Sequence, residues 1–392
     1  MTTEAIVLQH QDAAERPALA SLFLSFLRLG ATAFGGPAMV AYIRKLAVER
    51  QKWLDDSAFR DGVALCQAIP GATAMQTAAY VGLRARGLPG AVASFVGFGL
   101  PAFVLMMVLS SIYAYAYALP TALALFAGLK CIVVAIVANA AVSFGRNYLK
   151  TWQGAVIAGA AAGMFGLGLN PILVILAAAV LGLLLNKGER SLGSHTSLRF
   201  PKGLISILAA AAAGLALLFL FQRPLFDLAV LMLRIDLFAF GGGFASVPLM
   251  LHEVVDVRHW MNAPTFLDGI ALGQVTPGPI VITATFVGYL LQGLLGGLVA
   301  TISVFLPSFA MVVGIAPYFD KLRRSPSFQK ALGGVLCSFV GLLLTVAVRF
   351  GSNVHWDLGR AALAAAALAA LLLEVDILWV VLAGIMLSAF CF

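Results

Sequence analysis

Two arginines within apolar sequence are the residues best suited to chemistry. Arg28 and Arg234 each lie about two helical turns before a glycine pair, Gly35-Gly36 and Gly241-Gly242. An arginine inside a bilayer costs roughly 2.5 to 3.5 kcal/mol on insertion scales, so it indicates a functional site. Its guanidinium offers a planar fork of donors that fits oxyanion oxygens. We therefore predict that the arginines and glycines bind a doubly negative anion. The alternative is that the arginines reach the interface or pair with a helix carboxyl end, and that the glycines serve close helix packing.

Two proline-glycine breaks supply further candidate site residues. Pro277-Gly278-Pro279 divides the apolar stretch 264–291, and Pro70-Gly71-Ala72 divides 57–84. Proline removes a backbone donor and glycine permits a reversal, so each break ends one half-helix and starts another. Irregular backbone at membrane depth is tolerated only beside protein or a watery cavity. We expect Gln67 and Gln274, which precede the breaks, to contact the ion or to hydrogen bond between helices.

Three acidic residues and one lysine complete the set of candidates within apolar sequence. Asp236 precedes the second glycine pair, where the first half of the chain has Gly30, and is the candidate for proton coupling. The alternative is a salt bridge with Arg234 or a helix end. Asp61 and Asp268 lie near predicted half-helix starts, where a carboxylate complements the helix dipole. Lys130 lies deep in an apolar block and has no counterpart.

Composition places the chain in a membrane. Its 392 residues are 61% hydrophobic and 11% charged, with a mean hydropathy of +0.99. Soluble domains have about a quarter of their residues charged. The pattern predicts an all-α polytopic membrane protein that contacts lipid. The net charge of +8 is expected in cytoplasmic loops, and a nucleic-acid partner is not expected.

The sequence offers little support for cofactor or metal chemistry. Four cysteines lie in apolar segments without paired spacing, which indicates neither a disulfide framework nor a zinc site. The residues His252, Glu253, Asp256 and His259 have helical spacing, but a solvated external face is favoured over a metal. The chain has no nucleotide-binding loop and no hydrolase motif. We predict no cofactor, no metal and no enzymatic activity.

The chain is an internal duplication. Arg28, Phe34 and Gly35 correspond to Arg234, Phe240 and Gly241 at an offset of 206 (234 minus 28), and Trp53 to Gly71 correspond to Trp260 to Gly278 at 207. The offset returns to 206 at Val81. So many identities in one order indicate a repeat. We assign residues 1–17 to a polar tail, 18–186 to the first repeat, 187–222 to a basic cytoplasmic linker with a central transmembrane helix, and 223–392 to the second repeat.

The charges predict that the repeats have opposite orientations. Lys and Arg flank both breaks of the first repeat, whereas the matching stretches of the second hold only Arg258. The positive-inside rule then places the first set in the cytoplasm and the second outside. Each Pro-Gly unit becomes a re-entrant hairpin, as do the Gly-Gly units at 18–50 and 224–257. Transmembrane helices follow in each repeat. The N-terminus is expected to be cytoplasmic and the C-terminus external.

The doubled motif series resembles the chromate ion transporter family in its long, two-domain form. The series consists of Gly35-Gly36, Val48, Trp53, Pro70-Gly71, Gly82 and Gly90, and again Gly241-Gly242, Val255, Trp260, Pro277-Gly278-Pro279 and Gly288. The resemblance implies chromate export across a bacterial inner membrane, resistance to chromate, competition by sulfate, and energy from the membrane potential or the proton gradient. Ala72 departs from the motif, which has a second proline there. A passive oxyanion channel and a sulfate transporter are the alternatives, and a homodimer is one allowed assembly.

Overall fold

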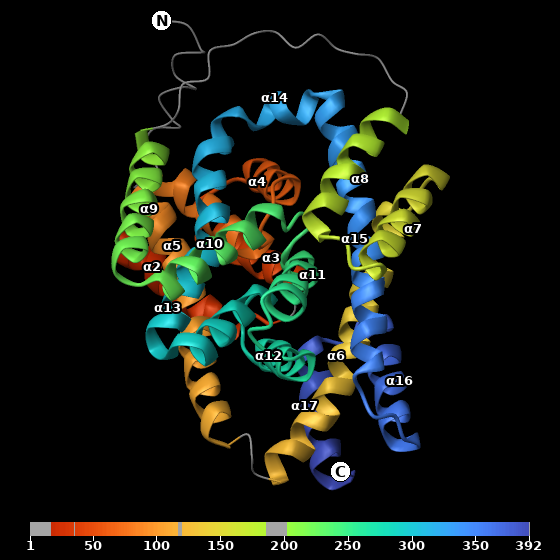
Figure 1. The fold of residues 1–392 in the computed structure, drawn as a ribbon. Helices are drawn as coiled ribbons and strands as arrows, with labels where there is room; N and C mark the ends of the chain where they lie inside the picture. The colour runs from red at the N-terminus through yellow and green to blue at the C-terminus, as the bar shows by residue number, and fades with distance from the viewer. Residues whose placement is uncertain (1–16, 35, 117–119, 186–201, 392) are drawn as a thin grey trace, which may run out of the picture.

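The computed structural model describes residues 17–34, 36–116, 120–185 and 202–391 (Figure 1). These residues form helices and connecting turns, with no strand among them, so the predicted all-α class is confirmed. Residues 1–16 of the polar tail, residues 186–201 of the basic stretch, and Gly35 lie outside the described residues. Within these described ranges, five stretches are long and apolar enough to cross a membrane, namely Thr73–Tyr115, Leu125–Tyr148, Gly203–Phe221, Ile280–Tyr318 and Pro326–Ser352.

The helices of the first repeat follow the predicted breaks. They are α2 (Leu19–Thr32), α3 (Gly36–Arg44), a π-helix (Lys45–Arg50), α4 (Asp56–Ala68), α5 (Thr73–Ala116), α6 (Pro120–Tyr148), α7 (Trp152–Gly166) and α8 (Pro171–Leu185). The single helix α9 (Lys202–Phe221) comes next and lies at the periphery of the molecule (Figure 1).

The second repeat has the same order of elements. They are α10 (Arg223–Phe238), a 3-10 turn (Gly243–Ala245), α11 (Ser246–Met250), a π-helix (Leu251–Val257), α12 (Ala263–Val275), a 3-10 turn (Ile280–Ile282), α13 (Thr283–Ile315), α14 (Phe319–Arg324), α15 (Pro326–Ser352), α16 (Leu358–Leu372) and α17 (Ile377–Cys391). A 3-10 turn (Ala316–Tyr318) links α13 to α14. Both repeats therefore carry a π-helical turn before their tryptophan.

Helices α4 and α12 begin with equivalent caps. The Asp55 carboxylate accepts from the Ala58 N–H, and the Asn262 side chain accepts from the Thr265 N–H. A capping oxygen satisfies one of the backbone donors left free at a helix start. The hydrogen bonds from the Ala58 N–H and the Ser57 hydroxyl hold the pKa of Asp55 below its ordinary value.

The Pro-Gly breaks are hairpins, as the sequence predicts. Gly71 and Gly278 have φ angles of 116° and 114°, in the left-handed region that favours glycine. The chain then returns along itself, because Gly62 of α4 lies against the Tyr80 ring of α5. Gly269 of α12 lies in the same way against Phe286 of α13.

Each hairpin is followed by a second reversal inside α5 or α13. The helical geometry is broken at Arg86 and Gly87 in α5, and at Gln292 and Gly293 in α13. Gly82 lies directly against the Gly90 backbone, and Gly288 against Gly296, so a side chain at any of the four would collide with the facing backbone. The long second part of α5 then crosses the molecule to the end where the trace toward α6 begins (Figure 1).

The two repeats interlock at their breaks. The Gly71 N–H of the first repeat donates to the Ala239 oxygen of the second at 2.8 Å, and the Gly278 N–H donates to the Ala33 oxygen of the first at 3.1 Å. These two bonds are equivalent under the repeat. The breaks of all four hairpins therefore meet at one centre, with the repeats running in opposite directions, as their charges predict (Figure 1).

The last two helices of each repeat pack on the other repeat. Helix α15 contacts α7 and α8, and α6 contacts α16 and α17. Each of these four partner helices has 15 residues. At 1.5 Å per residue they are about 22 Å long, shorter than the roughly 30 Å hydrocarbon core. These helices end at the turns after Gly166 and Leu372, and full crossings of the membrane at these positions stay a prediction.

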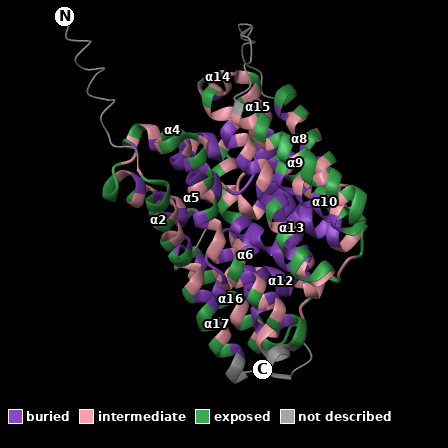
Figure 2. Cartoon of the chain, turned by 90° about the vertical axis from the view of Figure 1, so that its left-hand side faces the viewer, coloured by how far each residue is buried: buried purple, intermediate pink, exposed green. Residues whose placement is uncertain are grey.

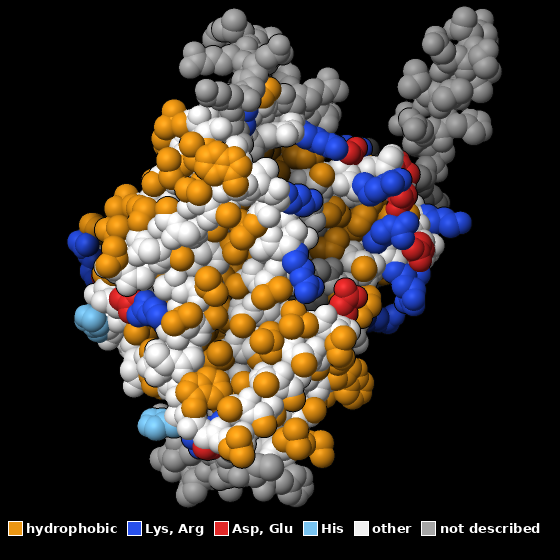
Figure 3. All heavy atoms as spheres, turned by 90° about the vertical axis from the view of Figure 1, so that its right-hand side faces the viewer, with side chains coloured by type: hydrophobic (Ala, Val, Ile, Leu, Met, Phe, Trp, Pro, Cys, Tyr) orange, Lys and Arg blue, Asp and Glu red, His pale blue; other side chains and the backbone are white. Residues whose placement is uncertain are grey.

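The surface agrees with a membrane environment. Buried residues concentrate along α10, α12 and α13, and exposed residues follow the outer helices (Figure 2). Many exposed residues are large and apolar, among them Leu173, Leu220 and Trp379. Hydrophobic side chains are spread over the whole face in Figure 3, and most Lys and Arg side chains gather toward its upper part.

Candidate functional site

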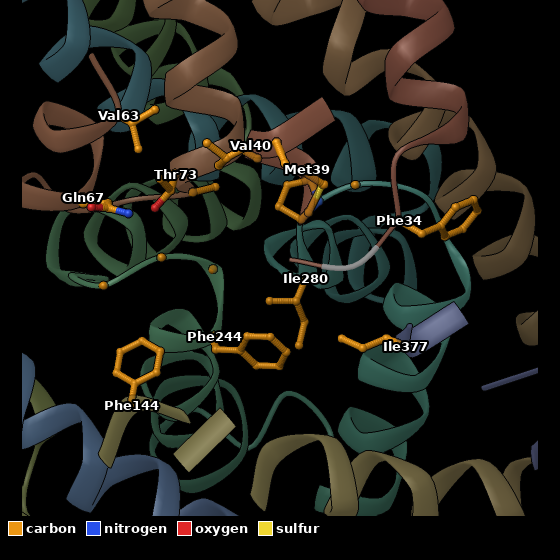
Figure 4. A pocket seen from close by; sticks show the side chains of 18 of the residues that line it. Phe34, Met39, Val40, Val63, Gln67, Thr73, Phe144, Phe244, Ile280 and Ile377 are labelled. Carbon is orange, nitrogen blue, oxygen red and sulfur yellow. The ribbon is translucent and has the colours of Figure 1, made fainter. Parts of the chain in front are cut away.

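A cavity of about 640 Å³ lies where the broken helices meet (Figure 4). Its lining comes from the Pro-Gly breaks of both repeats, from the Gly-Gly break of the second, and from the ends of α6 and α17. Gln67 and Thr73 lie on one side of the view, with Phe244, Ile280 and Ile377 on the other. A largely apolar pocket with a few converging polar groups is typical of a small-ligand site.

Half-helix starts supply backbone donors to this cavity. Thr73, Gly243 and Ile280 each begin a helical segment and each lines the wall. The first N–H groups of a helix have no partner within it, and the helix dipole adds partial positive charge there. Three such starts around one cavity favour an anion.

Side chains near the breaks add hydrogen-bonding groups. Gln67, Gln274, Thr73 and Thr276 line the cavity. The Gln274 Nε2 atom is buried and has no hydrogen-bond partner among the described residues. A buried unpaired donor is costly, so a ligand that accepts from it gains affinity. The Thr276 hydroxyl already donates to the Gly273 oxygen.

Two exposed arginines mark the mouth of the cavity. Arg44 and Arg60 line it and keep 43% and 73% of their side chains exposed. Arg44 pairs with Glu49 and Asp56, and Arg60 also pairs with Asp56. The cavity therefore opens at the end of the molecule that carries the start of α4. We call this end the basic end, because Arg84 and Arg86 lie there as well, close to Asp55 and Pro17.

The predicted glycines and prolines occupy different places. Gly241, Gly242 and Gly278 line the cavity, whereas Pro70, Gly71 and Pro277 form the breaks beside it. Gly241 and Gly242 have φ angles of 90° and 102°, and a side chain on Gly241 would meet the Phe144 ring. Gly36 begins α3.

The structure does not bring Arg28 and Arg234 to the cavity. Arg28 is exposed on α2 and is not among the residues that line the wall. The Arg234 guanidinium forms an ion pair with the buried Glu253 carboxylate. In the first repeat, Leu46 stands where the second has Glu253, so Arg28 lacks this partner. Contact between these arginines and an ion stays a prediction.

Asp236 is fully buried beside the break of the other repeat. It accepts hydrogen bonds from the Ser308 N–H at 2.8 Å and the Ser308 hydroxyl at 2.6 Å. Its Oδ1 atom has no partner among the described residues. The Ser308 hydroxyl also lies against Gly71. Ser308 therefore lies between Asp236 and this hairpin break in space. Its partner is thus α13 and not Arg234, which corrects the salt-bridge alternative.

The prediction of a solvated face for His252, Glu253, Asp256 and His259 is wrong for its first two members. His252 and Glu253 are 6% and 3% exposed. Arg349 of α15 donates to both Asp256 oxygens at 2.7 and 2.6 Å. The reason is that Phe165 of α7 packs against His252 and Arg349 of α15 binds Asp256, contacts that the sequence does not reveal. Cys66, Cys131 and Cys337 are buried free thiols.

Several lining residues were missed by the sequence argument. Arg44 and Arg60 served there only to set orientation, yet they line the mouth. Phe144, Asn147 and Tyr148 come from the end of α6, and Ile377 and Leu378 from the start of α17. No motif marks these positions. One signal in the sequence could have indicated them. If the breaks of both repeats meet at one centre, the helices that end near that centre also contribute residues to the cavity wall.

Inverted repeats with broken helices around a central cavity are typical of membrane transport proteins. The sequence profile of chromate transporters matches residues 20–183 and again 226–389. The chain belongs to the chromate transporter family.

Relatives cover most of the chain. An uncharacterized transporter of Methanocaldococcus jannaschii is 43% identical over 87% of this chain and 87% of its own length. Chromate transport proteins of Cupriavidus metallidurans and Pseudomonas aeruginosa are each 31% identical, over 90% and 82% of this chain and 88% and 78% of their own lengths. No solved structure matches the chain.

Proposed function

We propose that this protein is a secondary active transporter that exports chromate across the bacterial inner membrane and so confers resistance to chromate. The observation that carries the proposal is the cavity between inverted repeats, which reaches the surface at Arg44 and Arg60. A carrier exposes one site to each side in turn, whereas a channel is open at both. The chromate transport proteins among the relatives support the choice of substrate.

The ion is held by amide and backbone donors in this proposal. Gln67 and Gln274 bind the chromate oxygens together with the N–H groups at Thr73, Gly243 and Ile280. Hydrogen bonds to a charged group contribute about 1.5 to 3 kcal/mol each. Arg44 and Arg60 raise the local anion concentration at the mouth, an effect that salt screens. Sulfate has the same charge and shape and competes for the same donors.

The membrane potential supplies the energy for export. The positive-inside rule assigns the basic end to the cytoplasm, so the cavity loads from the cytoplasmic side. One charge crossing 100 mV is worth about 2.3 kcal/mol, and a dianion leaving an inside-negative cell gains about twice that. The N-terminus is then cytoplasmic and the C-terminus external.

Everted vesicles test the proposal. Labelled chromate is expected to accumulate when the vesicle interior is positive, and accumulation should stop when a potassium ionophore removes the potential. Gln67→Leu and Gln274→Leu should each raise the KM by about tenfold or more, which follows from one lost charged hydrogen bond. Downhill flux alone would indicate a channel, and accumulation of sulfate but not chromate would reassign the substrate.

Asp236 carries a coupled proton if the pH gradient contributes. Its buried carboxyl group lies next to Ser308 and the Gly71 break, where a change of charge alters the contact between repeats. Asp236→Asn should then make chromate accumulation independent of an imposed pH gradient, with the potential held fixed. Asp61→Asn is the matched control, because Asp61 is 58% exposed. Unchanged pH dependence in Asp236→Asn would exclude this role.

A further inference from the structure

An ionic cluster around the buried Asp268 joins the two repeats, and its cation Lys130 keeps 20% of its side chain exposed. Asp268 of α12 is 0% exposed. The Lys130 Nζ atom of α6 lies 3.2 Å from its Oδ1 atom, and the Tyr113 hydroxyl of α5 donates to its Oδ2 atom at 3.0 Å. The cluster therefore holds one residue of the second repeat between two residues of the first.

The cluster lies between the cavity and the end opposite the basic end. Helix α12 runs from its cap at Asn262 to Gln274, which lines the cavity, and Asp268 is midway. The Tyr113 ring packs edge-on against Phe126 and Phe286, with ring centroids 5.1 and 5.0 Å apart. These rings fill the space beside the ion pair.

The equivalent place at the basic end lacks such a cluster. Asp61 corresponds to Asp268, but Leu336 and Phe319 stand where Lys130 and Tyr113 would be. The Asp61 carboxylate is exposed and meets Arg323 of α14 at 3.3 Å. Among the described residues, the contact between the repeats at Asp268 is therefore buried, whereas its counterpart at Asp61 is exposed.

We propose that Lys130, Asp268 and Tyr113 form the gate that closes the cavity at the end opposite Arg44 and Arg60. In a buried ion pair, the free energy gained from the attraction of the two charges is roughly equal to the free energy lost when they leave water. The net contribution of the pair is therefore small. When α12 moves away from α6, water solvates both ions, and their free energy of hydration offsets the attraction that is lost. An ionic gate can therefore open and close with a small difference in free energy, which an apolar contact of the same size does not allow.

Cysteine labelling tests the gate without substrate. Ile270 is fully buried on α12, two residues after Asp268 in the chain. Ile270→Cys, in a chain with its four native cysteines replaced by serine, is exposed to a membrane-impermeant maleimide from the side opposite the basic end. We expect slow labelling with the cluster intact. Asp268→Asn and Lys130→Met should increase the labelling rate about tenfold or more, and Tyr113→Phe should increase it less, because one hydrogen bond is lost.

Two further variants separate a gate from general destabilisation. The double variant Lys130→Met with Asp268→Leu replaces the ion pair by an apolar contact and should return labelling of Ile270→Cys to the slow rate while chromate transport falls. Asp61→Asn, at the exposed counterpart, should leave labelling unchanged.

Unchanged labelling in all three single variants, or an equal increase in Asp61→Asn, would overturn the gate. If Asp268→Asn does not accumulate, the milder Tyr113→Phe variant decides the question. The gate rests on the carrier function proposed above, but labelling needs no transported ion, so a wrong substrate would leave this result standing.

Discussion

Helices α4 and α12 occupy equivalent places in the two repeats but have different surroundings. In α12 every residue from Phe266 to Gly273 is buried. In α4 only Phe59, Gly62, Leu65 and Cys66 are buried, and Arg60, Val63 and Ala64 line the cavity. The counterparts of these three lining residues, Leu267, Ile270 and Ala271, are each 0% exposed.

Two similar sequences therefore adopt two different packing environments in one molecule. The caps, the left-handed glycines and the tight Gly-Gly contacts are the same in both hairpins. The packing of the first half-helix differs, because α6 and α17 cover α12 while one face of α4 lines the cavity. An exchange of these two packing environments between the repeats would close the basic end and open the opposite one.

The largest expected effect is a contrast in accessibility between equivalent positions. Ala64→Cys lines the cavity and should react with an impermeant maleimide from the basic end. Ala271→Cys is buried, and its exposure requires local opening that costs a few kcal/mol, so its labelling should be slower on the order of a hundredfold. The measurement uses a chain without native cysteines. Equal rates at the two positions would remove the comparison on which the carrier mechanism depends.

Substituting alanine for Gly71 or Gly278 at the hairpin breaks should strongly reduce chromate transport. A left-handed conformation costs roughly 1 to 2 kcal/mol for other residues. A Gly278→Ala side chain would also lie 2.9 Å from the Ala102 Cβ atom, and a Gly71→Ala side chain would collide with Ser308. We expect chromate accumulation, normalised to protein in the membrane, to fall at least tenfold, with Gly71→Ala the more severe.

Gly159→Ala is the matched control for these substitutions, because no atom lies within 4 Å of the added carbon. It should leave both transport and abundance unchanged. Normal transport by Gly71→Ala would show that the break tolerates a side chain and that the two hairpins do not need their contact.

The symmetric arginines should differ in their effect on stability. Arg234→Gln leaves the buried Glu253 carboxylate with Arg258, whose Nε atom is 3.8 Å away, as its remaining cation. We expect a loss of about 1 to 3 kcal/mol, seen as a lower Tm in detergent and lower abundance. Arg28→Gln changes an exposed residue and should stay within about 0.5 kcal/mol. Loss of chromate transport in both variants at normal abundance would instead place both guanidinium groups at the ion.

The smallest expected effect concerns the caps of α4 and α12. Removing either capping side chain, by Asp55→Ala or Asn262→Ala, should lower stability by about 1 kcal/mol. Only the Asp55 contribution depends on pH. Because folding lowers its pKa, this stabilisation is present above the ordinary value near 4 and is lost as the pH falls through the folded value. Tm measured against pH for both variants checks this difference, and a parallel pH dependence in Asn262→Ala would contradict it.

Much of the fold was open to prediction from residues alone. Proline and glycine act locally, so Pro70-Gly71 and Pro277-Gly278 gave both hairpin breaks, and the doubled series predicted two repeats. Lys and Arg near the bilayer surface predicted opposite orientations. Asp236 was recognised as a buried charge, but its partner Ser308 lies 72 residues away on α13. Lys130 had no explanation, because Asp268 is brought to it only when α12 of one repeat packs on α6 of the other.

The amino-acid sequence was enough to locate the helix breaks, to count the repeated unit and to find the charged residues inside the membrane. The breaks follow from backbone chemistry, and the charged residues stand out because burying charge is costly. The tertiary structure alone decided that Arg234 is neutralised by Glu253, that Arg44 and Arg60 line a mouth, and that α12 is covered while α4 borders the cavity. The physical reason is that these outcomes depend on packing between segments far apart in the chain. Two copies of one pattern have nearly the same local preferences, and only their neighbours make them differ.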